Sequence, residues 1–248
     1  MRSLSWLRRA ALQLPLTFPM LAEPGLLAEV ERMRARHVGP DSVRVWRPHV
    51  SAGPLYQTPD PAQRPFVPLF TGSLDGWSVQ HSEGGNFTVR DGILRVEGPA
   101  GWLRYDRQQF ADFDLRTEFR FRTPDADSGV FVRAVGDRIF MRGWPGDSYQ
   151  VQVRVPTTPS FLPPLGGIFR HGTPPGPVDL DTDAVLKAFT GMNEWQQLEI
   201  TLAGDTLVAR VNGVETTRAS GFVARAGSIG IQGETGTLEY RSLEVRER

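Results

Sequence analysis

Short runs in which apolar and polar residues alternate fill the chain from Phe66 to its C-terminus. In the run "FDLRTEFRFR" one face is mostly apolar, made of Phe113, Leu115, Thr117, Phe119 and Phe121. A period of two predicts strands that bury one face. Between the runs, Asp91-Gly92 and Asn212-Gly213 are typical hairpin turns because both positions tolerate positive φ. The pattern predicts an all-β sandwich.

Two runs, "SGVFVR" and "YQVQV", place large polar side chains opposite their apolar residues. If these strands are neighbours, one sheet face brings together Arg133, Gln150, Gln152 and Arg154. Amides and guanidinium groups form hydrogen bonds with sugar hydroxyls or with a carboxylate, so these four are candidate ligand-binding residues. The alternative is a polar face that is solvated or covered by a loop.

Two loop residues join this list. His171 lies in a segment from 156 to 190 that is rich in proline and glycine, and such long loops are usually functional or held by a partner. Trp144 is a candidate for stacking on a sugar ring, with a core or rim position as the simpler alternative. For His171 the simpler alternative is an ordinary surface histidine.

The polar face of the run at 113–122 carries Arg116, Glu118, Arg120 and Arg122. These charges can pair across the sheet, as an exposed ladder of ion pairs. Glu118 is the acid that we take as a candidate general acid or base. Glycosidases use two carboxyls, about 5 to 9.5 Å apart, and the sequence offers no evident second one.

Composition narrows the function classes. Twenty-eight Lys and Arg balance 28 Asp and Glu, so no net field favours nucleic acid. The chain has no cysteine, and its four histidines lack zinc-ligand spacing, so we predict no metal and no cofactor. The sequence "DLDTD" at Asp179–Asp183 lacks the glycine and glutamate of an EF-hand, which favours a helix cap and leaves calcium as a weaker alternative.

Residues 1–65 differ from the β-rich part at 66–248, and we predict a domain boundary between them. The first part contains an apolar start, a short amphipathic helix in "PGLLAEVERMRARHVGP" and a proline-rich arm without a core of its own. The start is too short and too broken to span a bilayer. It is either a secretory signal peptide or a docking element. In the second case its anchors are Trp6, Leu12, Leu14, Leu16 and Phe18.

Seven motifs occur in an order and spacing that resemble the 3-keto-disaccharide hydrolase domain family. They are "LFTGSLDGW", "FTVRDGIL", "FADFDLRTEFRF", "SGVFVR", "YQVQV", "NEWQQLEITLAGDTLVARVNG" and "GSIGIQ". The resemblance covers about three quarters of the chain, from Phe66 onward. It implies a concanavalin A-like jelly-roll β-sandwich with a concave polar face suited to a saccharide. It also implies a bacterial protein, often exported, that hydrolyses 3-keto-glycosides.

The candidate site departs from that family. Members usually read Tyr-Glu-x-Gln-hydrophobic-x-Asp. This chain has Gln150 in place of the glutamate and Arg154 near the place of the aspartate, and neither residue can act as a carboxylate base. We therefore favour a non-catalytic or weakened module that binds a glycan or serves as a peripheral subunit of a larger, membrane-associated assembly through residues 1–65. A hydrolase of 3-keto-glycosides or disaccharides is the alternative. The location that follows is the surface of a bacterial membrane, or an exported or periplasmic one if the start is a signal peptide.

Overall fold

The computed structural model describes residues 60–81, 86–135 and 143–248. The predicted helix and the docking anchors of the N-terminal part lie outside these residues, so both stay predictions. The described part begins with the 3-10 helix η1 (Pro61–Gln63). None of its helices is long and apolar enough to cross a membrane.

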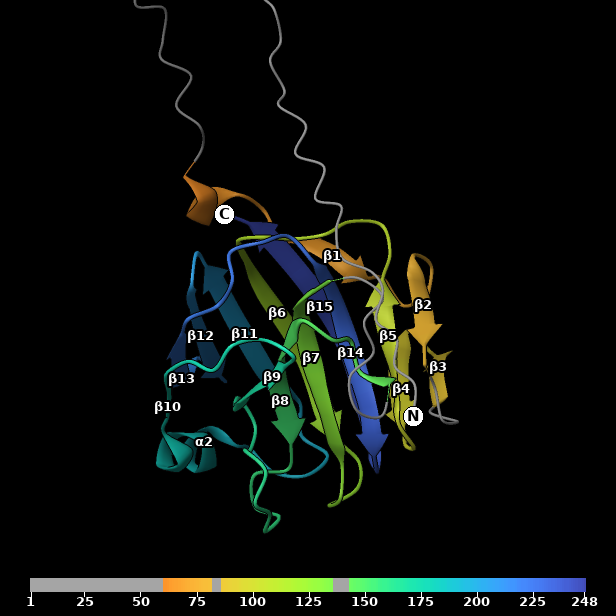
Figure 1. The fold of residues 1–248 in the computed structure, drawn as a ribbon. Helices are drawn as coiled ribbons and strands as arrows, with labels where there is room; N and C mark the ends of the chain where they lie inside the picture. Colours follow the sequence, from red (N-terminus) through yellow and green to blue (C-terminus); the bar gives the residue numbers. More distant parts are fainter. Residues whose placement is uncertain (1–59, 82–85, 136–142) are drawn as a thin grey trace, which may run out of the picture. The chain divides into compact units, whose positions relative to one another are not determined.

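Two antiparallel sheets make up the described part, one of nine strands and one of six (Figure 1). The nine-stranded sheet has the order β10 (Val178–Leu180), β13 (Val214–Ser220), β12 (Thr206–Val211), β11 (Gln196–Ala203), β6 (Phe113–Phe121), β15 (Thr237–Glu247), β4 (Ile93–Glu97) and β3 (Asn86–Arg90), and β1 (Val67–Phe70) also pairs with β15. The six-stranded sheet has the order β2 (Trp77–Gln80), β5 (Gly101–Tyr105), β14 (Ser228–Thr235), β7 (Asp127–Ala134), β8 (Ser148–Arg154) and β9 (Ile168–His171). The predicted all-β sandwich is confirmed.

The core lies between the sheets and follows the predicted alternation. All five inward residues of β6 are buried, and so are Tyr149, Val151 and Val153 of β8. A polar contact also joins the sheets within this core, because the hydroxyls of Ser128 and Tyr240 are 2.8 Å apart. Burial raises the pKa of Tyr240, which keeps the phenol protonated.

Both predicted hairpin turns are present. Asp91 and Gly92 have φ of 52° and 75° between β3 and β4, and Asn212 and Gly213 have φ of 47° and 80° between β12 and β13. Positive φ at both central residues is the geometry of a type I′ turn. The turn residues thus fix the pairing of their strands.

Helix α2 (Thr182–Ala188) follows β10. Its N-cap is Asp181, whose carboxylate accepts a hydrogen bond of 2.9 Å from the backbone N–H of Ala184. The segment "DLDTD" thus caps a helix as expected, with Asp181 as the cap and Thr182 and Asp183 inside the helix.

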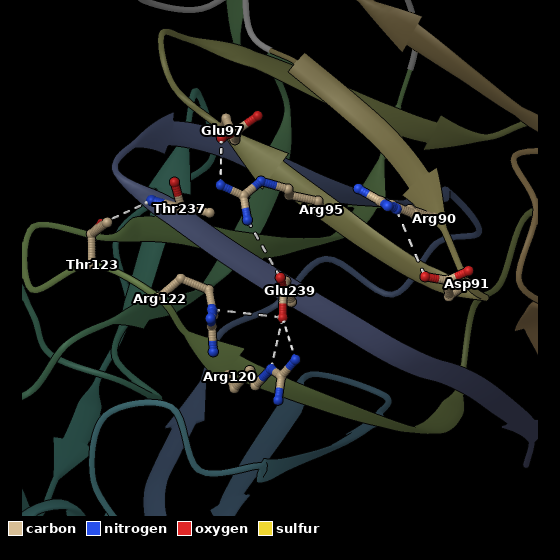
Figure 2. Close-up of polar contacts among 9 residues, drawn as sticks. All are labelled: Arg90, Asp91, Arg95, Glu97, Arg120, Arg122, Thr123, Thr237 and Glu239. Atoms are coloured by element: carbon tan, nitrogen blue, oxygen red, sulfur yellow. Dashed lines mark hydrogen bonds and ion pairs between the residues drawn. The ribbon is translucent and has the colours of Figure 1, made fainter.

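The predicted ladder of charges covers the face of the nine-stranded sheet that is turned away from the core. Figure 2 shows Glu239 of β15 between arginines of the neighbouring strands, 2.7 Å from Arg120 and 3.4 Å from Arg95. Arg122 is 3.8 Å from the same carboxylate. These side chains are partly exposed, so each pair contributes at most about 1 kcal/mol. The ladder makes this face polar.

Candidate functional site

The polar residues predicted on "YQVQV" lie on the outer face of the six-stranded sheet, meaning the face turned away from the nine-stranded sheet. Gln150 and Gln152 come from β8, and Gln232 comes from β14, with β7 between the two strands. We call these three side chains the amide row. Gln232 was not predicted, although "GSIGIQ" alternates in the same way and its outward position could have been inferred.

A glycine in the central strand makes the amide row possible. Gly129 of β7 lies in register with Gln152 on one side and Gln232 on the other. A Cβ atom at position 129 would lie only 2.5 Å from Nε2 of Gln150. Because glycine lacks that atom, the side chain of Gln150 passes over β7 and reaches Gln232 on β14.

Two carboxylates determine how the amides are oriented. Nε2 of Gln152 donates to Asp127 (2.8 Å), and Nε2 of Gln232 donates to Glu234 (3.1 Å). The carbonyl oxygens of both side chains are therefore turned toward Gln150. Nε2 of Gln150 donates one hydrogen to each of them, at 2.6 and 2.7 Å. Both hydrogens of that amide are used inside the protein.

His171 completes the hydrogen bonding of Gln150. The Nε2 atom of His171 is 2.9 Å from Oε1 of Gln150. That oxygen can only accept, so the imidazole carries its proton on Nε2. Burial lowers the pKa of His171 to about 4, and the ring is neutral near pH 7. The predicted His171 thus meets the predicted Gln150, but as a fixed neighbour.

The amide row is buried. Gln150 is 2% exposed and Gln152 is 1% exposed, although alternation placed both on a solvent or ligand face. These two residues therefore fit the alternative given above, in which the polar face is covered and not open to a ligand. Trp144 is buried as well, 6.1 Å from the ring of Phe131, which contacts Trp102 at 5.4 Å. The role expected for Trp144, stacking on a sugar ring, gains no support from this position.

Arg133 does not share this face, which corrects its predicted position. The residue has φ of 47°, and the register between β7 and β14 shifts beside it, so the alternation is broken. Its guanidinium donates to the carbonyls of Ala111, Gly204 and Val223 and to Asp112, each at 2.8 Å. Desolvation by burial lowers its pKa, while Asp112 opposes that change.

Arg154 lies at the end of β8, but its guanidinium holds a loop. It donates to the carbonyls of Thr158 (2.9 Å), Leu162 (3.1 Å) and Pro163 (3.4 Å). The side chain is 6% exposed. Arg154 thus orders the segment that follows its own strand.

Glu118 lies on the outer face of the other sheet, so the structure does not bring it near the amide row. Arg241 donates two hydrogen bonds to its carboxylate, at 2.9 and 2.7 Å. These bonds lower the pKa of Glu118 and outweigh the opposite effect of burial. A carboxylate held in this way is a poor general acid, because it stays ionised.

A pocket of about 640 Å³ lies on the outer face of the six-stranded sheet, beside the amide row. Its lining, which defines the Trp102 pocket, is Trp102, Arg104, Asp106, Arg107, Gln108, Gln109, Ala134 and Ser228. Trp102 pairs in register with Gln232, and its ring lies over Gly230, where a Cβ would be 2.6 Å from Cε3. Sequence reasoning missed this pocket, although "WLRYDRQQ" puts Trp102 and Arg104 on one face.

Potential metal ligands in the described part of the chain do not cluster at the amide row or at the Trp102 pocket. No group of three or more His, Cys, Asp or Glu residues within 60–81, 86–135 and 143–248 could hold an ion. The described residues therefore provide no calcium site of that kind.

Two stacked antiparallel sheets whose outer faces carry polar residues define a concanavalin A-like jelly-roll β-sandwich. A family model for the 3-keto-alpha-glucoside-1,2-lyase-like domain matches residues 65–246. The chain belongs to that family, and the predicted resemblance is confirmed. Among curated proteins, none matches this sequence.

Solved structures show the same fold. Two proteins from Parabacteroides distasonis ATCC 8503, described as candidate glycosyl hydrolases, align with TM-scores of 0.53 and 0.55 at 17% and 12% identity. The alignments cover 74% and 75% of this chain, and 100% and 95% of those chains. The calcium-bound exoplasmic/lumenal domain of VIP36 aligns with a TM-score of 0.50 at 12% identity, over 73% of this chain and 89% of that one.

Proposed function

We propose that this domain binds carbohydrate on the outer face of the six-stranded sheet without cleaving it, and that it serves as a peripheral subunit of a larger assembly. The observation that carries the proposal is the saturated amide of Gln150. Its NH₂ group donates to Gln152 and Gln232, and its oxygen faces His171. The amide of Gln150 has no unused donor and cannot serve as a general acid or base.

Position 150 matters because members of the family usually have a glutamate there. A carboxylate at 150 would take or give a proton, whereas an amide does neither at ordinary pH. Glu118 does not replace it, since it lies on the other sheet in a bidentate pair with Arg241. The sequence change and the geometry thus favour binding over turnover.

Support for a carbohydrate ligand comes from the family and from the fold. The family is named for a 3-keto-glucoside lyase, and two proteins of the same fold are described as candidate glycosyl hydrolases. The Trp102 pocket adds an aromatic ring and several hydrogen-bonding side chains, which is a common composition for sugar sites.

The test is to measure glycan binding and turnover on the same preparation of the full chain. Binding would be screened on a glycan array, and turnover would be assayed with 3-keto-glucosides and 3-keto-disaccharides. We expect binding without product. Product formation by the unmodified chain would overturn the non-catalytic part, and a chain that binds no glycan would overturn the proposal altogether.

Catalysis is the second candidate, because the amide row ends in two carboxylates. Asp127 and Glu234 each accept a hydrogen bond from the row and lie on neighbouring strands. If turnover is found, Asp127→Asn and Glu234→Gln should each reduce it at least tenfold, and Glu118→Gln should not. That pattern would establish a hydrolase or lyase on this face in place of the binding module.

The assembly role rests on the sequence of residues 1–65. An apolar start on a chain of zero formal net charge favours burial against a partner or a membrane surface. Deleting residues 1–65 should release the protein from its native particle, and replacing the five apolar anchors by serine should do the same. A deleted chain that still joins the particle would contradict docking through this segment.

A further inference from the structure

The Trp102 pocket is lined mainly by hydrogen-bond donors. Arg104 uses its Nε to donate to Asp106 at 2.6 Å, and its two terminal nitrogens donate to no other residue in the described part. Arg107 pairs with Asp75 through one terminal nitrogen. Two guanidinium groups thus line the pocket with unused N–H groups.

The ring of Trp102, which lines the pocket, also carries a buried donor. The indole N–H of Trp102 has no acceptor within residues 60–81, 86–135 and 143–248, and the side chain is 4% exposed. A buried N–H without an acceptor destabilises a fold, but this one is closed to solvent and so adds no donor to the pocket surface. Trp102 and Ala134 also supply an apolar surface beside these donors.

The acidic side chain of the pocket is already neutralised. Asp106 is the carboxylate among the eight lining residues, and two of the others are arginines. Burial raises the pKa of Asp106, but the hydrogen bonds from Ser78 and Arg104 outweigh it, so the net pKa is lowered and the group stays ionised. The eight lining residues together carry one net positive charge and an excess of donors, while Asp75, outside the lining, pairs with Arg107.

We infer that the Trp102 pocket binds an acidic sugar, a uronate residue whose carboxylate contacts Arg104 and Arg107 while its ring lies beside Trp102. This inference rests on the proposed carbohydrate binding and specifies its ligand class. Guanidinium groups bind carboxylates through charge-assisted hydrogen bonds, which makes the free acid preferred over a neutral sugar. A volume of about 640 Å³ is ample for one sugar unit with its neighbours.

The test is isothermal calorimetry on the full chain with uronate trisaccharides of gluco, galacto and manno configuration, each compared with its methyl ester. Esterification removes the negative charge and adds one methyl group, and leaves the sugar ring and its hydroxyls unchanged. We expect at least one acid to bind tenfold or more tightly than its ester at low salt. Equal affinity of acid and ester in all three pairs would overturn the inference while leaving carbohydrate binding intact, whereas failure on the whole glycan array would remove both.

Variants with opposite expected effects locate the contact. Arg104→Gln and Arg107→Gln should each abolish most of the preference for the acid, and Asp106→Asn should increase it because a competing carboxylate is lost. Arg95→Gln is the matched control, since it removes the same charge on the other sheet (Figure 2). A preference for the acid that survives both Arg104→Gln and Arg107→Gln would place the site elsewhere.

Discussion

The side chain of Gln150 lies across Gly129, and it leaves no space for a Cβ atom at position 129. A Cβ at position 129 would be 2.5 Å from the amide nitrogen and 2.6 Å from Cγ of Gln150. The amide cannot move aside freely, because Gln152 and Gln232 hold it on two sides. The polar residues of β8 and β14 are therefore joined by hydrogen bonds across β7, over the space that the missing side chain of Gly129 leaves.

Gly129→Ala should break this arrangement. The methyl group displaces Gln150, which leaves the carbonyl oxygens of Gln152 and Gln232 buried without a donor. We expect a loss of about 1 to 3 kcal/mol in the free energy of unfolding, measured by urea denaturation.

A double-mutant cycle supplies the control. In a Gln150→Ala background the clash is gone. Gly129→Ala should therefore lower the free energy of unfolding clearly less in that background than it does alone. An equal loss of unfolding free energy in both backgrounds would mean that position 129 needs glycine for its backbone conformation and not for the amide row.

His171 should make stability depend on acid pH. The unfolded imidazole protonates below about pH 6.5, but the folded one stays neutral until about pH 4. Protons therefore favour the unfolded chain in this window, and about 3 kcal/mol of stability is lost as the pH falls from 6.5 to 4.

His171→Gln keeps a donor for Gln150 and removes the titration. The free energy of unfolding, measured with urea at pH 7 and at pH 4.5, should fall less between these two pH values for this variant than for the unmodified chain. Identical drops would show that the histidine is protonated in the folded protein.

Arg133→Lys should destabilise the fold although it keeps the charge. One ammonium group cannot reach the three carbonyls and the carboxylate that the guanidinium contacts, and buried acceptors lose their donors. We expect a cost of about 3 to 5 kcal/mol in chemical denaturation. Arg90→Lys is the control, because Arg90 is 92% exposed and should change nothing measurable.

Glu118→Gln should be nearly silent. The pair with Arg241 is partly exposed, with side-chain exposures of 34% and 41%, so its loss costs less than about 1 kcal/mol. Glycan affinity should not change either, because Glu118 lies on the other sheet. A marked loss of affinity or turnover would revive its candidacy as an active-site acid.

The sequence predicted the sandwich because alternation and turn residues act locally. The apolar face of β6, from Phe113 to Phe121, points into the core as expected, and Asn212-Gly213 forms its hairpin. The site was harder to predict, because contacts between strands decide it. Gln150 was predicted to face a ligand, but Gly129 lets it bond to Gln232 instead.

Arg133 shows a second limit of sequence reasoning. Strict alternation places it beside Gln150, but one residue with positive φ turns its side chain toward three loops. The Trp102 pocket was missed for a related reason. Six of its eight lining residues lie between Trp102 and Gln109, but Ala134 and Ser228 come from β7 and β14, which the pairing of β5, β14 and β7 brings alongside.

Three arginines, Arg133, Arg154 and Arg170, bind loops through backbone carbonyl oxygens. A carbonyl is common to all amino acids, so these ties fix the path of a loop without specifying its side chains. Phe161, which lies in the loop held by Arg154, is 96% exposed and takes no part in the tie. Loops of this domain can therefore diverge in sequence during evolution at little cost, whereas insertions or deletions that move the carbonyls would be selected against.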